Sequence, residues 1–518
     1  MVEVCLVFEV HQPYRINRRF RIEEAENKTD QELFDLYFDN QLNREIFQRV
    51  AEKCYLPATK TLLESASRNR RDKRPFKFAF SFSGIYLEQC QRWCPQLLSL
   101  YKDLFKTGCL ELVSQTYFHS LSSIFYENMD EFKEQVRQHV SLMKELMGAK
   151  PSVFENTELI YNNLIARAVF ELGFKGIITE GSPKIMAGRS PHRVYNSKGI
   201  PGLKVLLRDY SLSDDIGFRF SARWWEHYPL TAEKYASWIA KIAEPLVLIF
   251  VDYETFGEHH WPESGIHEFL RLLPDELLKH DSVHFSTPSE LVANIPSEGE
   301  LDVYEQGKTV SWADTARDLS PWLGNEFQRA SFNAVRLMGT NIPERHYKRL
   351  WRYLQTSDHY YYMYTGFGGP AEVHSYFAGP LGSPSDLYRV FSSIWTDLLI
   401  RATKRQGLVS VVEAEIKGNK SRAFQFWLDE NKVLNIKAMG LKEFTEVIKT
   451  IDRRSIEYHS KRGDFENWIE GCFGDPVLAR ALKDTGSRLQ GEDLRKAMVE
   501  ILEKRVRELE RIVRINEK

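Results

Sequence analysis

The acidic side chain of Asp252 follows the most apolar run of the sequence. Residues 246–251 read Leu-Val-Leu-Ile-Phe-Val, which predicts a buried strand that ends at this acid. Burial and a neighbouring carboxylate would both raise the pKa of such an acid and suit it to donate a proton near neutral pH. An aspartate in this place is also a common cap of a helix or turn, so spacing alone leaves both interpretations open.

Further reactive side chains follow other expected strands. Glu158 comes shortly after a short strand and suits either a catalytic role or a place at a helix start, and Glu155 is equally eligible for catalysis. His11 ends the first strand, where a histidine that only completes the core is the alternative. Glu111 is the polar member of an alternating strand and points either into a barrel or outward.

These side chains need a scaffold that brings them together. The first ~295 residues alternate short β-rich runs with helical patterns, which predicts an α/β fold with a parallel sheet or barrel. The expected strands are residues 2–10, 76–82, 110–114, 152–154, 176–179, 204–207, 246–251 and 284–286. Such a set suits a (β/α) barrel, in which the strand ends converge on one pocket.

Acids on different strand ends can serve as a catalytic pair. A retaining glycosidase needs two carboxyls about 5–5.5 Å apart, one as nucleophile and one as acid/base. Sugar rings also stack on flat apolar side chains, although each tryptophan by itself is more typical of a core. The candidate tryptophans are Trp224, Trp225, Trp261, Trp312 and Trp322.

The chain changes character after the expected barrel. Residues 296–301 form a polar, turn-rich break, and residues 325–337, 344–355 and 385–405 are expected to be helices. Next come a hairpin of residues 423–428 and 433–436 and a charged C-terminal helix. Its apolar residues are Val499, Leu502, Val506, Leu509 and Val513. We expect this seam to pack on its own domain, with homo-oligomer formation as the alternative. The expected domains are 1–295, 296–408 and 409–518.

Composition narrows the class of protein. A chain of 518 residues is too long for one core, and its net charge of −2 argues against a nucleic-acid partner. The N-terminal stretch contains Glu3 and Glu9 and makes a poor signal peptide, and no apolar stretch is long enough to span a membrane. Six cysteines are too few for a disulfide framework, and Cys90 and Cys94 are expected to be helical neighbours. We therefore expect a cytoplasmic protein.

Five ordered segments resemble the signature segments of glycoside hydrolase family 57. They are residues 11–13, 108–113, 154–161, 252–257 and 287–290. The resemblance continues through residues 311–314, 317–320, 322–325 and 355–359. Together with residues 156–161 and 212–215, these segments are most similar to the α-amylase group of the family. The resemblance covers about residues 1–405.

The resemblance implies a fold, an activity and a site. The fold would be an incomplete (β/α)7 TIM-like barrel, then an α-helical domain that completes the active-site cleft, then a small, mostly helical C-terminal module. The substrate would be an α-glucan or maltooligosaccharide, with retention of configuration and no required metal or other cofactor. Glu158 would be the nucleophile and Asp252 the acid/base. The expected substrate-binding residues are His11, Glu111, Asp215, Trp261, Trp312 and Asp358.

Several functions remain open at this point. Hydrolysis of α-1,4-glucans by double displacement is the leading hypothesis, and 4-α-glucanotransferase activity on the same scaffold is the nearest alternative. A metal-dependent hydrolase resembling polysaccharide deacetylases would use His11, Asp252 and either His259 or His260, although adjacent strand residues rarely bind one ion. A non-catalytic glucan-binding protein is the third alternative. Linkage, chain-length preference and the role of the last hundred residues do not follow from the sequence.

Overall fold

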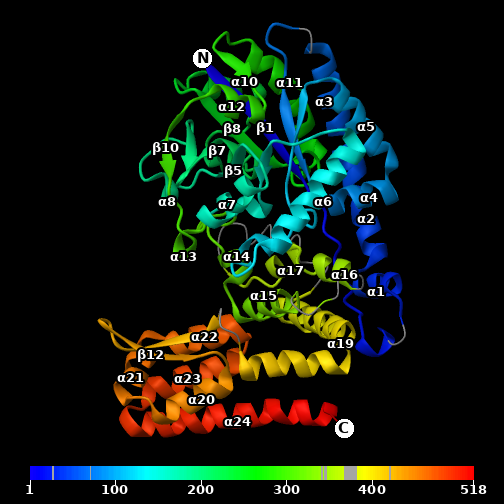
Figure 1. The fold of residues 1–518 in the computed structure, drawn as a ribbon. Coiled ribbons are helices and arrows are strands. Elements are labelled where there is room, and N and C mark those ends of the chain that lie inside the picture. The colour runs from blue at the N-terminus through cyan, green and yellow to red at the C-terminus, as the bar shows by residue number, and fades with distance from the viewer. Residues whose placement is uncertain are drawn as a thin grey trace.

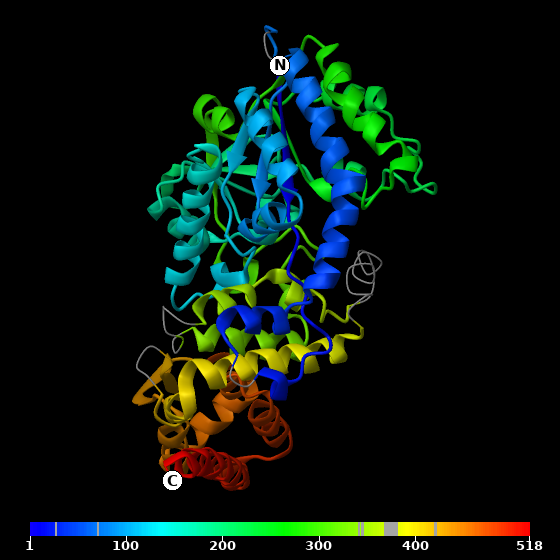
Figure 2. The same cartoon turned by 90° about the vertical axis from the view of Figure 1, so that its right-hand side faces the viewer.

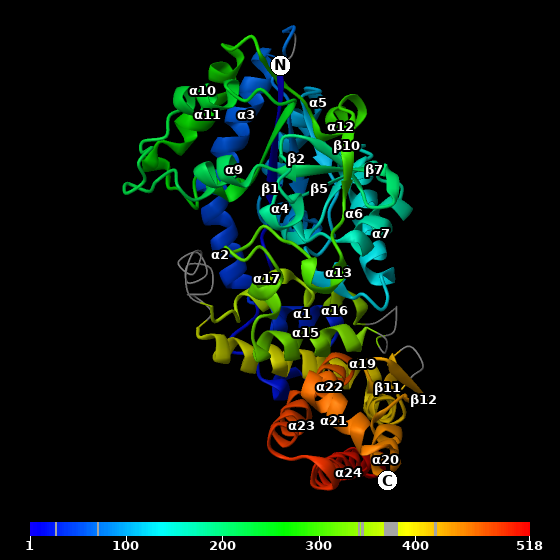
Figure 3. The ribbon, with the colours of Figure 1, turned by 90° about the vertical axis from the view of Figure 1, so that its left-hand side faces the viewer.

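Three regions follow one another along the molecule in the order of the sequence (Figure 1). The computed structural model describes residues 1–25, 28–69, 72–339, 342, 347–366, 382–418 and 422–517. The N-terminal end lies in a barrel, a layer of helices follows, and the C-terminal module lies at the far end. Figures 2 and 3 show the same succession from two other sides.

Seven parallel strands of the described chain form the barrel. They are β1 (Val2–Val10), β2 (Phe78–Phe82), β3 (Leu110–Val113), β4 (Val153–Glu155), β5 (Gly176–Glu180), β7 (Ile200–Arg208) and β8 (Leu246–Asp252). Hydrogen bonding orders them as β3-β2-β1-β8 and as β4-β5-β7. A bridge between Ser114 and Phe154 joins β3 to β4, and the Asp209 N–H donates to the Leu248 carbonyl between β7 and β8. The strand order therefore leads back to β1.

Three shorter strands complete the two sheets. β9 (Val283–Phe285) pairs with the start of β1, β6 (Val194–Ser197) lies antiparallel to β7, and β10 (Ser297–Leu301) pairs with β6. The eight expected strands are all present, with ends that differ by a few residues. The expected turn-rich break at 296–301 is wrong for residues 297–301, which form β10. Its polar side chains suit the largely exposed edge of a sheet, where backbone pairing to β6 decides the structure.

Helices and short helical turns connect the strands, and most of them cover the outside of the barrel. They are η1 (Ile22–Ala25), α1 (Asp30–Tyr37), α2 (Asn40–Val50), η2 (Ala51–Tyr55), α3 (Leu56–Asn69), α4 (Gly84–Trp93), α5 (Pro95–Lys106), η3 (Leu121–Ile124), α6 (Asp130–Met147), η4 (Thr157–Leu159), α7 (Asn163–Glu171), α8 (Pro183–Met186), α9 (Tyr210–Gly217), α10 (Ala232–Ala240), η5 (Tyr253–Thr255), η6 (Pro262–Ser264), α11 (Ile266–Leu278) and α12 (Pro288–Asn294). Parallel strands with both faces covered explain the continuous apolar runs of β1 and β8. The fold is an incomplete TIM-like barrel.

A helical region covers the C-terminal ends of the strands (Figure 3). It comprises α13 (Glu305–Lys308), α14 (Ser320–Leu323), α15 (Glu326–Met338), α16 (Lys348–Tyr353), α17 (Ser357–Tyr361) and α19 (Pro384–Lys417). α1 lies in the same layer although it precedes β2 in sequence, and the Tyr37 hydroxyl donates to Asp397 of α19. Phe154 and Tyr161 of the barrel share one core with Val335 and Trp351, so the two regions pack as a continuous body.

The C-terminal module has a core of its own. It contains the hairpin β11 (Phe424–Asp429) and β12 (Lys432–Ala438), then α20 (Leu441–Thr450), α21 (Arg453–Arg462), α22 (Asp464–Phe473), α23 (Pro476–Arg488) and α24 (Gly491–Glu517). The expected domain boundary at residue 408 falls inside α19, which continues to Lys417. The expected packing of the apolar seam is confirmed for Leu502, Val506 and Leu509, which are buried in this core. The Val513 side chain lies outside the described part of the chain.

Two further expectations concern the chain as a whole. No helix in the described part is both long and apolar enough to cross a membrane. None of the six cysteines, all of which the structure describes, forms a disulfide. Cys90 lies within α4 and Cys94 is the residue that follows its last turn.

Candidate active site

Asp252 is the last residue of β8, at the barrel end that faces the helical region. The six residues before it are buried, and the strand delivers the carboxyl half-buried. Burial and the neighbouring Glu158 carboxylate raise the pKa of Asp252 to about 7, although His119 and Arg208 oppose the rise. Asp252 therefore titrates near neutral pH, as its position after an apolar run predicts, and can act there as a proton donor or acceptor.

Glu158 lies in the short turn η4, three residues after the end of β4. Glu158 and Leu159 have φ angles of 60° and 52°, in the left-handed region that costs a non-glycine residue on the order of 1–2 kcal/mol. Neighbouring residues fix this turn. The backbone N–H of Trp312 donates to the Glu158 carbonyl, and the Thr179 hydroxyl donates to the Leu159 carbonyl. The turn aims the Glu158 side chain toward the helical region.

The Glu158 carboxylate receives a hydrogen bond at each oxygen from the helical region. The Trp312 indole N–H donates to Oε2 at 2.8 Å, and the Ser357 hydroxyl donates to Oε1 at 2.8 Å. His119 Nε2 lies 3.6 Å from Oε1. Both oxygens are thereby held in one orientation, which suits a group that must attack along a defined line.

A buried ion network holds the segment that carries Trp312. Arg317 pairs with Glu180 at 2.6 Å and with Asp214 at 3.1 Å, and it also donates to the Trp312 carbonyl. Arg208 of β7 pairs with the same two acids, and its guanidinium lies 5.6 Å from the centre of the Trp312 ring. The network thus connects the strand ends of the barrel to the Trp312 indole.

Two stacked histidines form another wall of the site. The rings of His11 and His119 have centres 3.9 Å apart and an interplanar angle of 22°. His11 Nε2 donates to Asp358 of α17 at 3.0 Å, and Nδ1 accepts from the Ser83 hydroxyl. Burial and the charge of His119 lower the pKa of His11 to about 4, so His11 is neutral at pH 7. The Asp358 pKa is lowered because His11 and His119 outweigh the effect of burial.

The loop after β8 is anchored to η2, a single π-helical turn. The Tyr55 hydroxyl donates to the buried Glu254, and the Cys54 thiol donates to the Tyr253 carbonyl. Burial, then Asp252, raise the pKa of Glu254 well above its usual range, which keeps it neutral. A Cβ at Gly257 would lie 2.0 Å from the Lys53 carbonyl oxygen, so only glycine allows this approach. Glu254, whose role the sequence leaves open, thus binds Tyr55.

The structure brings three of the expected substrate-binding residues into this site, because Trp312 binds Glu158 and His11 binds Asp358. Asp252 lies near enough to Glu158 for the charge of Glu158 to raise its pKa. Glu111 is placed elsewhere. Its Oε2 accepts from the Ser289 N–H and hydroxyl at the start of α12, which packs at the other end of the strands.

Three other expected residues also lie apart from this group. Asp215 of α9 pairs with Arg219, which follows the helix, whereas its neighbour Asp214 joins the network of Arg208. Trp261 is 58% exposed, with the Lys53 ammonium 4.3 Å from its ring centre. The His260 ring contacts the Ser221 hydroxyl and the Ile216 carbonyl. No three His, Cys, Asp or Glu side chains are arranged as a metal site in the described ranges.

Several contacting residues are absent from the predicted set of catalytic and binding residues. His119, Ser357 and Arg317 touch Glu158 or hold its partner. Glu9 and Glu155, of which the sequence makes Glu155 an alternative catalytic acid, lie buried beneath the pair. Glu9 and Glu155 have a signal that sequence reasoning can use, because each is an acid near the C-terminal end of a strand and follows apolar residues. Ser357 and Arg317 lie in the resembling segments 355–359 and 317–320, but a serine and an arginine do not by their type alone indicate a role at the site.

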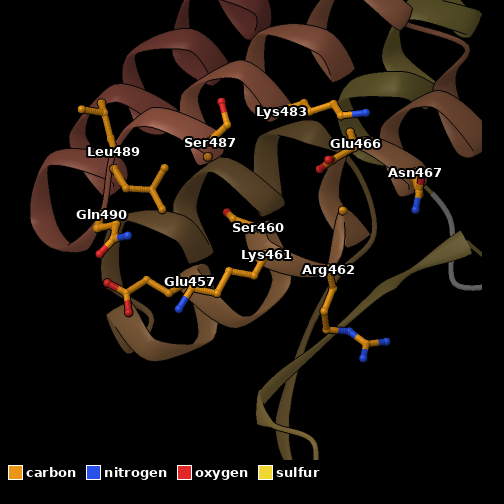
Figure 4. Close-up of a pocket in the computed structure, with 13 residues that line it drawn as sticks. Glu457, Ser460, Lys461, Arg462, Glu466, Asn467, Lys483, Ser487, Leu489 and Gln490 are labelled. Carbon is orange, nitrogen blue, oxygen red and sulfur yellow. The ribbon is translucent and has the colours of Figure 1, made fainter.

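A separate hollow lies in the C-terminal module, between α21, α22, α23 and the start of α24 (Figure 4). Apart from Leu489, its labelled lining is polar and includes Lys483, Glu466 and Gln490. None of the residues that surround Glu158 and Asp252 belongs to it.

A TIM-like barrel that presents two carboxyls at or beyond its strand ends, with the charge of one raising the pKa of the other, suits a glycosidase. The sequence matches the profile of Glycosyl hydrolase family 57 over residues 5–304, more than half of the chain. A Methanocaldococcus jannaschii protein that carries an alpha-amylase name is 45% identical over 401 residues, which cover 75% of this chain and 82% of that protein. The chain belongs to glycosyl hydrolase family 57 and is a glycosidase.

Solved structures support the fold. The 4-alpha-glucanotransferase of Thermococcus litoralis aligns with a TM-score of 0.53 and 17% identity, over 77% of this chain and 60% of that one. The chain thus spans less than two thirds of that enzyme. The GH57 branching enzyme of Thermococcus kodakaraensis, solved in complex with glucose, aligns with a TM-score of 0.52 and 14% identity, over 80% and 91%. At these identities the likeness concerns the fold alone.

Proposed function

We propose that the chain is a retaining glycosidase that hydrolyses α-1,4-glucans, with Glu158 as nucleophile and Asp252 as acid/base. The observation that carries this proposal is that the two carboxyls have different surroundings. Glu158 is fixed at both oxygens by donors, whereas Asp252 has a pKa raised to about 7 by burial and by Glu158. A fixed carboxylate suits attack, and an acid that titrates near pH 7 suits proton transfer in both directions.

The reaction would proceed by double displacement. Glu158 attacks the anomeric carbon while Asp252 protonates the departing glycosidic oxygen, so the C–O bond to the leaving sugar breaks and a glycosyl ester forms. Asp252, now ionised, removes a proton from water as the water oxygen attacks the same carbon. The ester bond breaks, Glu158 is restored as carboxylate, and Asp252 regains its proton.

We propose the same domain division as the sequence suggests, with the helical region contributing to the cleft. Trp312 and Ser357 from that region support this division, because both donate to Glu158 of the barrel. Asp358, which holds His11, comes from the same region. The residues beyond 408 supply no contact named in this mechanism.

A product profile on maltoheptaose and soluble starch tests the proposal. Hydrolysis releases net reducing ends, whereas a 4-α-glucanotransferase redistributes chain lengths without them. Glu158→Gln and Asp252→Asn should each abolish turnover, and Glu263→Gln, which changes an exposed acid of η6, is the matched control. Full activity of Glu158→Gln would refute the mechanism. Loss of activity on chelation, with recovery on zinc, would instead favour the deacetylase-like alternative, and saturable glycogen binding without product would favour a binding protein.

A further inference from the structure

Two buried carboxyls lie beneath the proposed catalytic pair. Glu9 of β1 is 1% exposed and Glu155 of β4 is fully buried. Strand register places Glu9 beside Asp252 of β8 and beside Ser81 of β2. The Ser81 hydroxyl donates to Glu155 Oε1 at 2.7 Å, and Gln115 donates to the same hydroxyl oxygen. In the described part of the chain, no donor is bonded to Glu9 Oε1 or Glu155 Oε2.

The two carboxyls meet at Ser81, whose backbone pairs with Glu9 and whose hydroxyl binds Glu155, so they act on each other in a buried space. Ionised carboxylates only accept hydrogen bonds, so a hydrogen bond between these two requires a proton on one of them. A second proton would leave the pair neutral, and none would leave two charges in contact in a low-dielectric interior. Burial and the nearby carboxylates raise the pKa of Glu9 well above its usual range, and burial raises the pKa of Glu155 to about 7. A pair that holds one proton and one negative charge agrees with the raised pKa of Glu9 and with the raised pKa of Glu155.

His119 lies between this pair and Glu158. Its Nδ1 is 3.3 Å from Glu9 Oε1 and 3.0 Å from the Gln115 side-chain oxygen, and its Nε2 is 3.6 Å from Glu158 Oε1. Oxygen acceptors face both ring nitrogens, and only the imidazolium cation has an N–H at both.

Most charged groups around the His119 ring favour the cation. The surrounding acids are Glu9, Glu155, Glu158, Asp252 and Asp358, and the stacked His11 is the one basic neighbour among them. Burial disfavours the charged ring, but the acids outweigh it and raise the pKa of His119. His11 takes the complementary state, because two stacked rings in contact cannot both carry a charge at low cost.

We propose that Glu9 and Glu155 share one proton and act as a unit whose single negative charge, together with the charges of Glu158 and Asp358, keeps His119 cationic. Both are positioning residues, because they act on Glu158 through His119. This inference deepens the proposed function and rests on it where it names Glu158 as the nucleophile.

If Glu9 and Glu155 share a proton, the effects of Glu9→Gln and Glu155→Gln on the pKa of His119 are not additive. In Glu9→Gln the remaining Glu155 can give up the shared proton and keep one negative charge, and the reverse holds for Glu155→Gln. Each single variant should therefore leave the pKa of His119 within about 0.5 of the wild-type value. The double variant removes the charge and should lower the pKa of His119 by about 1 to 3.

The measurement is a pH titration of the full chain by NMR with ring-labelled histidine. His119→Gln identifies the His119 signal among the 14 histidines. Glu254→Gln is the matched control, since it removes a buried carboxyl that binds Tyr55, and it should leave the His119 titration in place. A double variant that lowers the pKa, with each single variant giving less than half of that change, supports the proposal.

Three results would overturn it. The double variant could leave the His119 titration unchanged, or one single variant could produce half or more of the full effect, which would place the charge on one residue. The wild-type protein gives a third test, which does not depend on whether the variants fold. His119 must titrate above the ordinary imidazole pKa of about 6.5, and titration below it contradicts the proposal.

A kinetic readout separates this inference from the proposed function. In the double variant the acid limb of the pH profile of kcat/KM should move to higher pH, because a neutral His119 no longer favours the charged carboxylate of Glu158. A limb that stays at its wild-type position would count against the coupling. If Glu158→Gln kept full activity, the proposed function would fail while the NMR result on His119 stood.

Discussion

The Trp312 indole N–H donates a 2.8 Å hydrogen bond to Oε2 of Glu158, across 154 positions of sequence and between the helical region and the barrel. A donor brought from another part of the fold can orient a carboxylate that sits on a strained turn. This contact explains how the helical region can take part in the chemistry of the barrel although both proposed catalytic acids belong to the barrel.

Trp312→Phe should lower kcat by about 10- to 100-fold, because a hydrogen bond to a charged group contributes about 1.5–3 kcal/mol. Steady-state kinetics on maltoheptaose measure the effect. Trp322→Phe is the matched control, since the buried Trp322 N–H has no acceptor in the described structure and its loss removes no such bond. Equal losses in the two variants would show that ring packing, and not the hydrogen bond, matters.

Asp252 predicts the alkaline limb of the pH profile. The acid must be protonated to assist departure of the leaving group, and its pKa is raised to about 7. The value of kcat/KM should therefore fall tenfold per pH unit at pH values above about 7. A limb that begins below pH 5 or is absent up to pH 9 would contradict this assignment.

The same pKa predicts a stability change in Asp252→Asn. The folded-state pKa lies above the unfolded value, so the ionised aspartate destabilises the fold as pH rises through about 4 to 7. Asn carries no charge, so the variant should gain on the order of 2 kcal/mol at pH 8 and nothing at pH 3. Urea unfolding at the two pH values measures the difference, and an equal effect at both would show a cause other than ionisation.

Arg317→Met should destabilise the protein by about 3 kcal/mol, because it breaks ion pairs with the buried Glu180 and with Asp214. It should also reduce kcat, since Arg317 holds the segment of Trp312. Arg219→Met removes the pair of Asp215 on α9, which is partly exposed, and should cost less than about 1 kcal/mol with little effect on kcat. If Arg219→Met instead carried the larger kinetic effect, Asp215 and not Asp214 would face the substrate.

Much of the barrel follows from the sequence. Continuous apolar runs such as residues 246–251 predict buried parallel strands, and the acid at the end of that run has the raised pKa that its position implies. β10 escapes prediction because its polar, largely exposed residues carry no burial signal, and β6 escapes because it is short and half polar although most of it is buried. Backbone pairing makes strands of both, since β6 pairs with β7 and β10 pairs with β6.

The candidate site, too, is predicted only in part by the sequence. Types and order of residues point to Glu158 and Asp252, but the left-handed conformation of Glu158 has no sequence signal, because no glycine marks it. Glu111 alternates in a strand and was expected at the sugar, whereas its carboxyl binds the start of α12. Alternation tells which residues share a face and does not tell which partner a tertiary contact supplies.

The most direct test of the account is to identify the residue that carries the glycosyl group. A fluorinated maltosyl fluoride that slows the second step should trap the intermediate, and peptide mapping by mass spectrometry locates it. The account predicts a mass increase of one glycosyl unit on Glu158, absent in Glu158→Gln. A label on any other residue, or product of inverted configuration with no covalent intermediate, would contradict it.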